Sequence, residues 1–146
     1  MNALKNKIFI ANDHAGFTLK KYILETLPHF NITDLGCHSE QPVDYPDFAQ
    51  ILCENIKDAT SFGILICGSG IGMSIAANRY PNIRAALCHD IEYAKLAREH
   101  NNANVIALGA RFLNPEDAVN MITCFLLTDF IGARHINRVN KLSLLG

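Results

Sequence analysis

The sequence predicts an α/β protein with a mostly parallel, five-stranded central sheet, helices on both faces of the sheet and a C-terminal helical segment. Short apolar runs alternate with amphipathic stretches along the chain, which is typical of strand–helix–strand units. The runs are continuously apolar, as expected for parallel strands that are buried on both faces. With 146 residues, the chain fits one domain spanning residues 1–146.

The first half of the chain contains two strand–helix units. Residues 7–11 have the pattern of a buried strand, and residues 16–27 place Leu19, Ile23 and Leu27 on one face of a helix. Residues 32–35 predict the second strand. After a loop with two prolines, the second helix is marked by apolar residues at helical spacing: Phe48, Ile51, Leu52 and Ile56.

The second half continues the alternation. The third, fourth and fifth strands are predicted over residues 64–66, 85–88 and 105–108. Helices are predicted over residues 73–80 and 91–100, and from Pro115 and Glu116 onward. Nothing in the pattern indicates a linker, an internal repeat or a low-complexity stretch.

Composition argues against several classes of function. A net charge of −1 gives no electrostatic footprint for nucleic acid. The longest apolar runs are far shorter than the roughly 20 residues that span a bilayer, so no membrane association is expected. The cysteines lack the spacing of a zinc site, and their odd number without a signal peptide favours a reducing cytoplasm. They are Cys37, Cys53, Cys67, Cys88 and Cys124.

Polar residues follow three of the predicted strands. Asp13 and His14 come after the first, Cys67 and Ser69 after the third, and Gly109–Arg111 after the last. In parallel sheets, ligands bind at the carboxyl ends of the strands, so one crevice could contain all of them. Each residue also has a structural interpretation: Asp13 as a helix cap, Cys67 as a small core residue, Arg111 as a surface charge.

A glycine-rich turn surrounds the thiol. Gly68, Gly70 and Gly72 allow backbone N–H groups to approach a bound group, and the helix that follows favours anions at its N-terminus. The segment lacks the third glycine of a dinucleotide fingerprint and the Lys of a Walker loop. It could therefore hold a phosphate or a developing oxyanion beside Cys67, or be a plain strand-to-helix connection.

Two further groups have open interpretations. His100 ends a predicted helix, where an imidazole interacts well with the helix dipole without any catalytic role. Arg134 and Arg138 lie four residues apart and would share one helical face. Such a pair is either a solvated face or a clamp for a phosphate.

Five segments, taken together, resemble a known family. They are NDHAGF at 12–17, DYPDFA at 44–49, GILICGSGIGMSIAANR at 63–79, REHNNANVIALGAR at 98–111 and GARHINRV at 132–139. They look like the B-type ribose-5-phosphate isomerases, in a group that also holds the subunits of galactose-6-phosphate isomerase. The resemblance covers nearly the whole chain, in order. It implies a Rossmann-like, three-layer αβα fold and a homodimer with shared active sites, leaving tetramers open.

The resemblance also implies an activity and catalytic roles. The reaction would interconvert D-ribose 5-phosphate and D-ribulose 5-phosphate in the pentose phosphate pathway, without metal or cofactor. Cys67 would be the base, because Met73 occupies the position where another branch of the family has Glu. His100 of the partner subunit would protonate the ring oxygen, and Asp13 would assist at the hydroxyl. Ser69 stands where the family has Ser or Thr.

Further residues would bind the substrate. The turn that stabilises the enediolate would comprise Gly68, Ser69, Gly70, Ile71, Gly72 and Ser74. The phosphate, the hydroxyls and the walls of the site would be contacted by His14, Tyr45, Asn101, Arg111, Arg134 and Arg138.

Two other functions remain possible on sequence alone. One is the isomerisation of a six-carbon sugar phosphate such as allose 6-phosphate or galactose 6-phosphate. The galactose enzymes of this group use two different subunits, whereas this chain has both the thiol and the histidine. The other is a non-catalytic nucleotide-binding module, which would leave Cys67 and His100 without a role.

Overall fold

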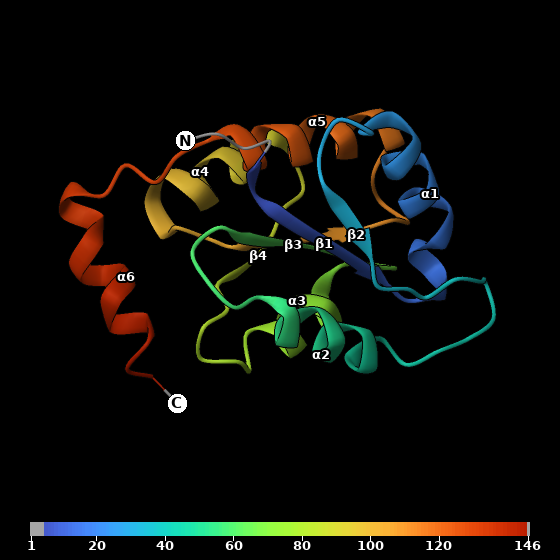
Figure 1. Cartoon of the computed structure of the whole chain (residues 1–146), viewed down its shortest axis with the longest axis horizontal. Helices are drawn as coiled ribbons and strands as arrows, with labels where there is room; N and C mark the ends of the chain where they lie inside the picture. The colour runs from blue at the N-terminus through green and yellow to red at the C-terminus, as the bar shows by residue number, and fades with distance from the viewer. Residues whose placement is uncertain (1–4, 146) are drawn as a thin grey trace.

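The computed structural model describes residues 5–145 and contains one five-stranded sheet between two layers of helices (Figure 1). All strand pairs are parallel, in the order β2-β1-β3-β5-β4, so the expectation of a mostly parallel sheet is met in full. The strands are β1 (Lys7–Asn12), β2 (Ile32–Asp34), β3 (Ser61–Cys67), β4 (Ala85–Leu87) and β5 (Val105–Gly109).

The helices divide between the two faces. Helices α1, α4 and α5 cover one face and α2 and α3 the other, while α6 projects beyond one end of the sheet (Figure 1). Their bounds are α1 (Phe17–Thr26), α2 (Tyr45–Asn55), α3 (Ile71–Ala77), α4 (Ile91–Asn101), α5 (Pro115–Leu127) and α6 (Ile136–Leu142). Short 3₁₀ turns, η2 (His14–Gly16) and η3 (Ala133–His135), precede α1 and α6.

Alternation along the central strands separates the two cores. In β3, Ile64 and Ile66 pack under α1, α4 and α5, whereas Leu65 and Cys67 pack under α2 and α3. Successive side chains of a strand point to opposite faces, and every residue of β3 is buried. The Cys67 side chain therefore lies on the α2–α3 face, at the last residue of the strand.

Several predicted boundaries differ from the structure: β3 is longer than residues 64–66, and two differences affect the candidate site residues. Helix α3 covers Ile71–Ala77 rather than residues 73–80, because Gly70 caps it with φ +79° and Asn78 ends it. The Asn78 side chain instead makes two hydrogen bonds to the backbone of Ala85. Arg134 lies in η3, outside α6, so it does not share a regular α-helical face with Arg138.

The sheet has two functional edges, defined by the ends of its strands. The carboxyl edge is where β1, β3 and β5 end, at Asn12, Cys67 and Gly109. The amino edge is where these strands begin, and α4 returns to it before β5 starts. Along residues 5–145, no helix is long and apolar enough to cross a membrane.

Candidate active site

Cys67 receives a hydrogen bond from the turn that follows it. The Gly70 N–H donates to Cys67 Sγ over 3.1 Å, and the side chain is 5% exposed. This backbone donor fixes the position of the sulfur at the end of β3. From the sequence, the N–H groups of this turn were expected to face a bound group. The Gly70 N–H, with Gly70 in the left-handed conformation, instead points at the Cys67 sulfur.

The other glycines of the turn allow close approach by side chains of the site. A Cβ on Gly68 would lie 2.8 Å from Arg111 Nη1, and a Cβ on Gly72 would lie 2.6 Å from the Tyr45 ring. Both side chains therefore lie against the backbone of the turn. Arg111 is also tied to it by its own N–H, which donates to the Gly68 carbonyl oxygen over 3.1 Å.

Hydroxyl groups of the turn bond within it. Ser69 Oγ accepts from the Ile71 N–H over 3.2 Å, and Ser74 Oγ donates to the Ile71 carbonyl oxygen over 2.8 Å. These bonds fix the start of α3 beneath Cys67. Met73 is fully buried in the core that also contains Cys67.

Asp13 and His14 enter the same edge from β1. The Asp13 N–H donates to the Ile66 carbonyl oxygen over 3.1 Å, which places Asp13 beside the end of β3. Asp13 Oδ1 accepts from the Ala15 N–H over 3.0 Å, as an N-cap does. His14 Nδ1 accepts from the Val43 N–H over 3.1 Å. This bond leaves Nε2 to carry the proton of the neutral ring and to act as a donor.

We call these residues the carboxyl-edge group. They come from the ends of β1, β3 and β5 and from the starts of α2 and α3, and the structure brings them together as the sequence predicted. The group comprises Asp13, His14, Tyr45, Cys67, Gly68, Ser69, Gly70, Ile71, Gly72, Ser74 and Arg111.

The remaining predicted residues form an amino-edge group. His100 and Asn101 end α4, and the His100 ring stacks on that of His135 with centroids 4.4 Å apart. Arg134 and Arg138 flank His135 and are exposed. Burial lowers the pKa of His135, and His100, Arg134 and Arg138 lower it further by charge repulsion.

The two groups do not meet within one chain. The five residues of β5 separate the two edges of the sheet, and at about 3.3 Å per residue this is roughly 15 Å. Within a single chain, His100 therefore does not share the crevice of Cys67, and its expected place in the site requires a partner subunit. His100 is displaced because α4 starts at the carboxyl edge and runs back to the amino edge before it ends.

A groove of about 900 Å³ lies beside the amino-edge group, along the unpaired side of β4. His100 and Asn101 line it together with the C-terminal residues Leu142 and Leu145. Exposed apolar side chains border both groups: Ile71 and Ile75 near the first, and Tyr93, Leu96, Leu142 and Leu145 near the second.

Other cysteines lack the surroundings of Cys67. Burial raises the pKa of the Cys53 thiol to about 12, with repulsion from Glu54 adding to the shift. Burial and then Asp90 raise the pKa of Cys88 to about 12 as well. Both thiols stay protonated at neutral pH and are unsuited to proton abstraction.

Two contacts of the site were missed on the sequence. The Val43 backbone and His135 contact predicted site residues that are 29 and 35 positions away in the chain. No local pattern marks such contacts, because they arise only when distant segments pack together.

Among residues 5–145, no group of three or more His, Cys, Asp or Glu could hold a metal ion.

Comparison with known proteins decides the family. The model of the ribose/galactose isomerase family matches residues 8–142 of this chain. This chain belongs to that family. As a member of the ribose/galactose isomerase family, the protein is a sugar phosphate isomerase, as the motifs of the sequence indicated.

Individual relatives agree with this family. A protein of Rickettsia typhi, named only as a candidate sugar phosphate isomerase, is 47% identical over 92% of this chain and 96% of its own. The structure of a ribose 5-phosphate isomerase from Thermotoga maritima is 46% identical, covers 97% and 99% of the two chains and has a TM-score of 0.93. A Mycoplasma genitalium ribose-5-phosphate isomerase B, solved with bound ribulose-5-phosphate, is 41% identical over 97% and 96%, with a TM-score of 0.91.

Proposed function

We propose that this chain interconverts D-ribose 5-phosphate and D-ribulose 5-phosphate, with Cys67 as the base. The observation that supports it most is the 3.1 Å hydrogen bond from the Gly70 N–H to Cys67 Sγ. This donor holds the sulfur at the end of β3, where a base would lie to reach a substrate bound at the carboxyl edge of the sheet. The ribulose-5-phosphate bound to the Mycoplasma genitalium relative names the product.

Ring opening precedes proton transfer in this proposal. His100 of a second subunit protonates the ring oxygen of the furanose, and Asp13 accepts the proton of the anomeric hydroxyl. The C–O bond of the ring then breaks, and the open-chain aldehyde forms. A positioned acid or base contributes about 10²- to 10⁴-fold to such a step.

The Cys67 thiolate then removes the proton from C2 of the aldehyde. The electrons of that C–H bond form the C1–C2 double bond, and the carbonyl oxygen becomes negatively charged. In this proposal the enediolate is stabilised by Ser69 and by those N–H groups of the turn from Gly68 to Gly72 that do not already donate to Cys67 Sγ or Ser69 Oγ. Return of the proton to C1, with transfer of the hydroxyl proton from O2 to O1, gives the ketose with no change in composition.

The phosphate is bound by cationic side chains in this proposal. His14 and Arg111 supply donors from the carboxyl edge, and Arg134 and Arg138 supply guanidinium groups from the partner. Exposed arginines can form bidentate hydrogen bonds to a phosphate. Tyr45 and Asn101 line the walls of the site.

The protein acts as a homodimer in this proposal, because one chain holds the two groups at opposite edges of its sheet. A second copy would bring its amino-edge group to the carboxyl-edge group of the first. The exposed apolar side chains around both groups support this pairing, since patches of this kind mark interaction surfaces.

The deciding experiment compares substrates on the purified full chain at matched concentrations. We expect kcat/KM for ribose 5-phosphate to exceed those for allose 6-phosphate and galactose 6-phosphate. A higher value for either six-carbon sugar would replace the proposed substrate. No turnover of any of the three, together with thermal stabilisation by a nucleotide, would replace the enzyme with a nucleotide-binding module.

A further inference from the structure

Lys20 is a buried cation that the proposed reaction does not use. It lies in α1, its side chain is 2% exposed, and it is among the largest of the fully buried residues. Its neighbour Lys21 is exposed on the same helix. Burying a charge costs free energy unless it is paired and hydrogen-bonded, so the partners of Lys20 show what the burial achieves.

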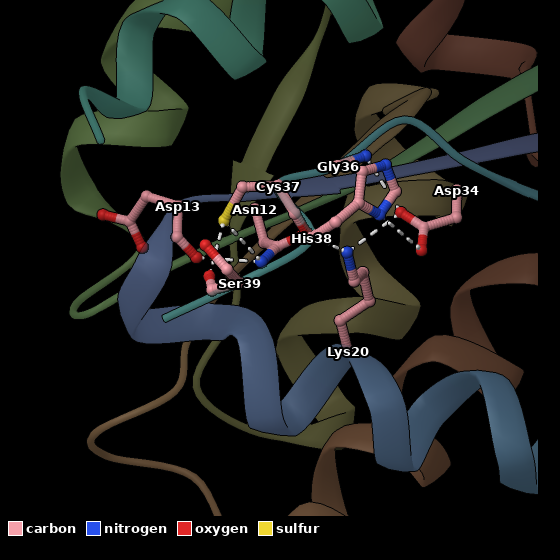
Figure 2. Close-up of polar contacts among 8 residues, drawn as sticks. All are labelled: Asn12, Asp13, Lys20, Asp34, Gly36, Cys37, His38 and Ser39. Carbon is pink, nitrogen blue, oxygen red and sulfur yellow. Dashed lines mark hydrogen bonds and ion pairs between the residues drawn. The ribbon is translucent and has the colours of Figure 1, made fainter. Parts of the chain in front are cut away.

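The Lys20 ammonium holds the segment that follows β2. Lys20 Nζ lies 3.0 Å from Asp34 Oδ1 and also donates to the Cys37 carbonyl oxygen. The same Asp34 oxygen accepts from the Gly36 N–H over 2.9 Å. Figure 2 shows Lys20 extending from α1 toward Asp34, with Cys37 and Asn12 beside it. Three residues of one turn are thus fixed around one charge.

This turn grips the end of β1 next to the candidate active site. The Asn12 N–H donates to the Gly36 carbonyl oxygen over 2.7 Å, and the Cys37 N–H donates to the Asn12 carbonyl oxygen over 2.9 Å. Asn12 Nδ2 in turn donates to Cys37 Sγ and to the Asp13 carbonyl oxygen, over 3.5 and 2.8 Å (Figure 2). The backbone that carries Asp13 therefore depends on the turn.

The far end of the same segment sets the orientation of His14. Starting at the turn, residues 36–43 pass over the edge of the sheet, and the Val43 N–H donates to His14 Nδ1 over 3.1 Å. Thr18 Oγ1 donates to Glu40 Oε1 over 3.1 Å at the surface between these ends. With Nδ1 occupied as an acceptor, Nε2 of the neutral ring carries the proton.

We propose that Lys20 is a positioning residue of the isomerase. Its ammonium anchors residues 34–43, and through them it holds Asp13 and selects the His14 tautomer that presents an Nε2–H donor to the substrate. This inference rests on the proposed function, because it gives Asp13 and His14 the roles proposed there. A purely structural Lys20–Asp34 pair would instead be replaceable by neutral groups without loss of activity.

The test compares Lys20→Met with Lys21→Met. Both lysines lie on α1, with Nζ 5.4 and 5.7 Å from the centroid of the Phe17 ring. The two variants therefore make the same substitution on the same helix, once at a buried lysine and once at an exposed one. We expect Lys20→Met to lower kcat/KM for ribose 5-phosphate by about 10- to 100-fold, mainly through KM, as displaced binding groups do. Lys21→Met should match the unaltered protein.

A double variant separates positioning from stability. Lys20→Met removes the ammonium from Asp34, whose other basic neighbour is His38, with Nδ1 3.8 Å from Asp34 Oδ2. Lys20→Met with Asp34→Asn removes both the ammonium and the carboxylate. We expect the double variant to unfold at a higher urea concentration than Lys20→Met, yet to keep the low kcat/KM. If Lys20→Met does not fold, the double variant takes its place in the activity comparison. Unaltered kcat/KM in the double variant would overturn the proposal.

Nitrogen NMR of His14 gives a readout that does not need turnover. The unaltered chain should show the Nε2–H tautomer, and the double variant a mixture of the two tautomers. An unchanged tautomer in the double variant would also overturn the positioning role. If the unaltered protein shows this tautomer but does not isomerise ribose 5-phosphate, the proposed substrate fails while the link from Lys20 to His14 stands.

Discussion

The carboxyl-edge group and the amino-edge group differ in what holds their residues in place. Cys67 is buried at a strand end and bonded to a backbone N–H, and the turn around it packs too closely for additional Cβ atoms. By contrast, Arg134 and Arg138 are exposed on short helical turns, and His100 is positioned by a stacked ring. The first group is held by the backbone around it, whereas the arginines of the second are exposed.

This difference matches the chemistry proposed for each group. Stabilising an enediolate needs donors that are already in position, which a rigid backbone turn provides. Binding a phosphate and delivering a proton to a ring oxygen tolerate side chains that settle on contact with substrate. The predictions below test whether the two groups have these separate roles.

The largest effect is expected from Cys67→Ala. Without the base, kcat/KM for ribose 5-phosphate should fall by about 10²- to 10⁴-fold, while circular dichroism and substrate binding stay close to those of the unaltered protein. Cys124→Ala, at a half-buried thiol on α5, is the matched control and should keep full activity. Substantial turnover by Cys67→Ala would remove the thiol from its role.

A smaller loss is expected from Gly70→Ala. Gly70 has φ +79°, and a Cβ there would lie 2.6 Å from Leu87 Cδ1 and 2.9 Å from the Leu108 carbonyl carbon. The N–H would shift away from Cys67 Sγ, and loss of a hydrogen bond to a group that acts in its charged form costs about 10- to 100-fold in kcat.

Gly132→Ala is the control for backbone conformation. Gly132 has φ +76°, but a Cβ there would come no closer than 3.4 Å to Ile136. It should lose about 1–3 kcal/mol of stability, because φ +76° with ψ −124° is unfavourable for a residue with a Cβ, and retain far more kcat than Gly70→Ala. Equal losses of kcat in the two variants would show that strain, rather than the bond to sulfur, explains the effect.

Pairing of the two groups across subunits predicts complementation. Cys67→Ala and His100→Asn, each inactive, are co-expressed with different tags, and the protein carrying both tags is purified. One of the two sites of such a dimer would be unaltered, so about half of the normal activity per dimer should return. Activity no higher than that of the separate variants would place Cys67 and His100 in the same subunit's site or remove one of them.

The smallest effect concerns pH and the amino-edge group. Because the pKa of His135 is lowered in the folded protein, the unfolded chain binds more protons to this residue. The free energy of unfolding should therefore fall as pH drops below about 6.5, the ordinary histidine value, and His135→Gln should lack that part of the fall. Urea midpoints at pH 7.5 and 5.5 measure the difference. Equal falls in both proteins would contradict the shift.

The two groups also differ in how far the sequence could predict them. Residues of the carboxyl edge follow directly after apolar strands, and in a parallel sheet all such positions reach the same edge. Asp13, Cys67 and Arg111 could therefore be grouped from the sequence. His100 could not, because its place depends on the direction of α4, and its contact with His135 spans 35 positions.

The sequence by itself determined the α/β class, the parallel sheet, the family and the set of polar residues at strand ends, since periodicity and local motifs encode these. Only the tertiary structure decided that the Gly70 N–H points at sulfur, that His14 is held by the Val43 backbone and that Lys20 is buried against Asp34. It also separated the predicted site into two groups. Each of these depends on a backbone torsion or on contacts between distant segments, and local sequence patterns specify neither.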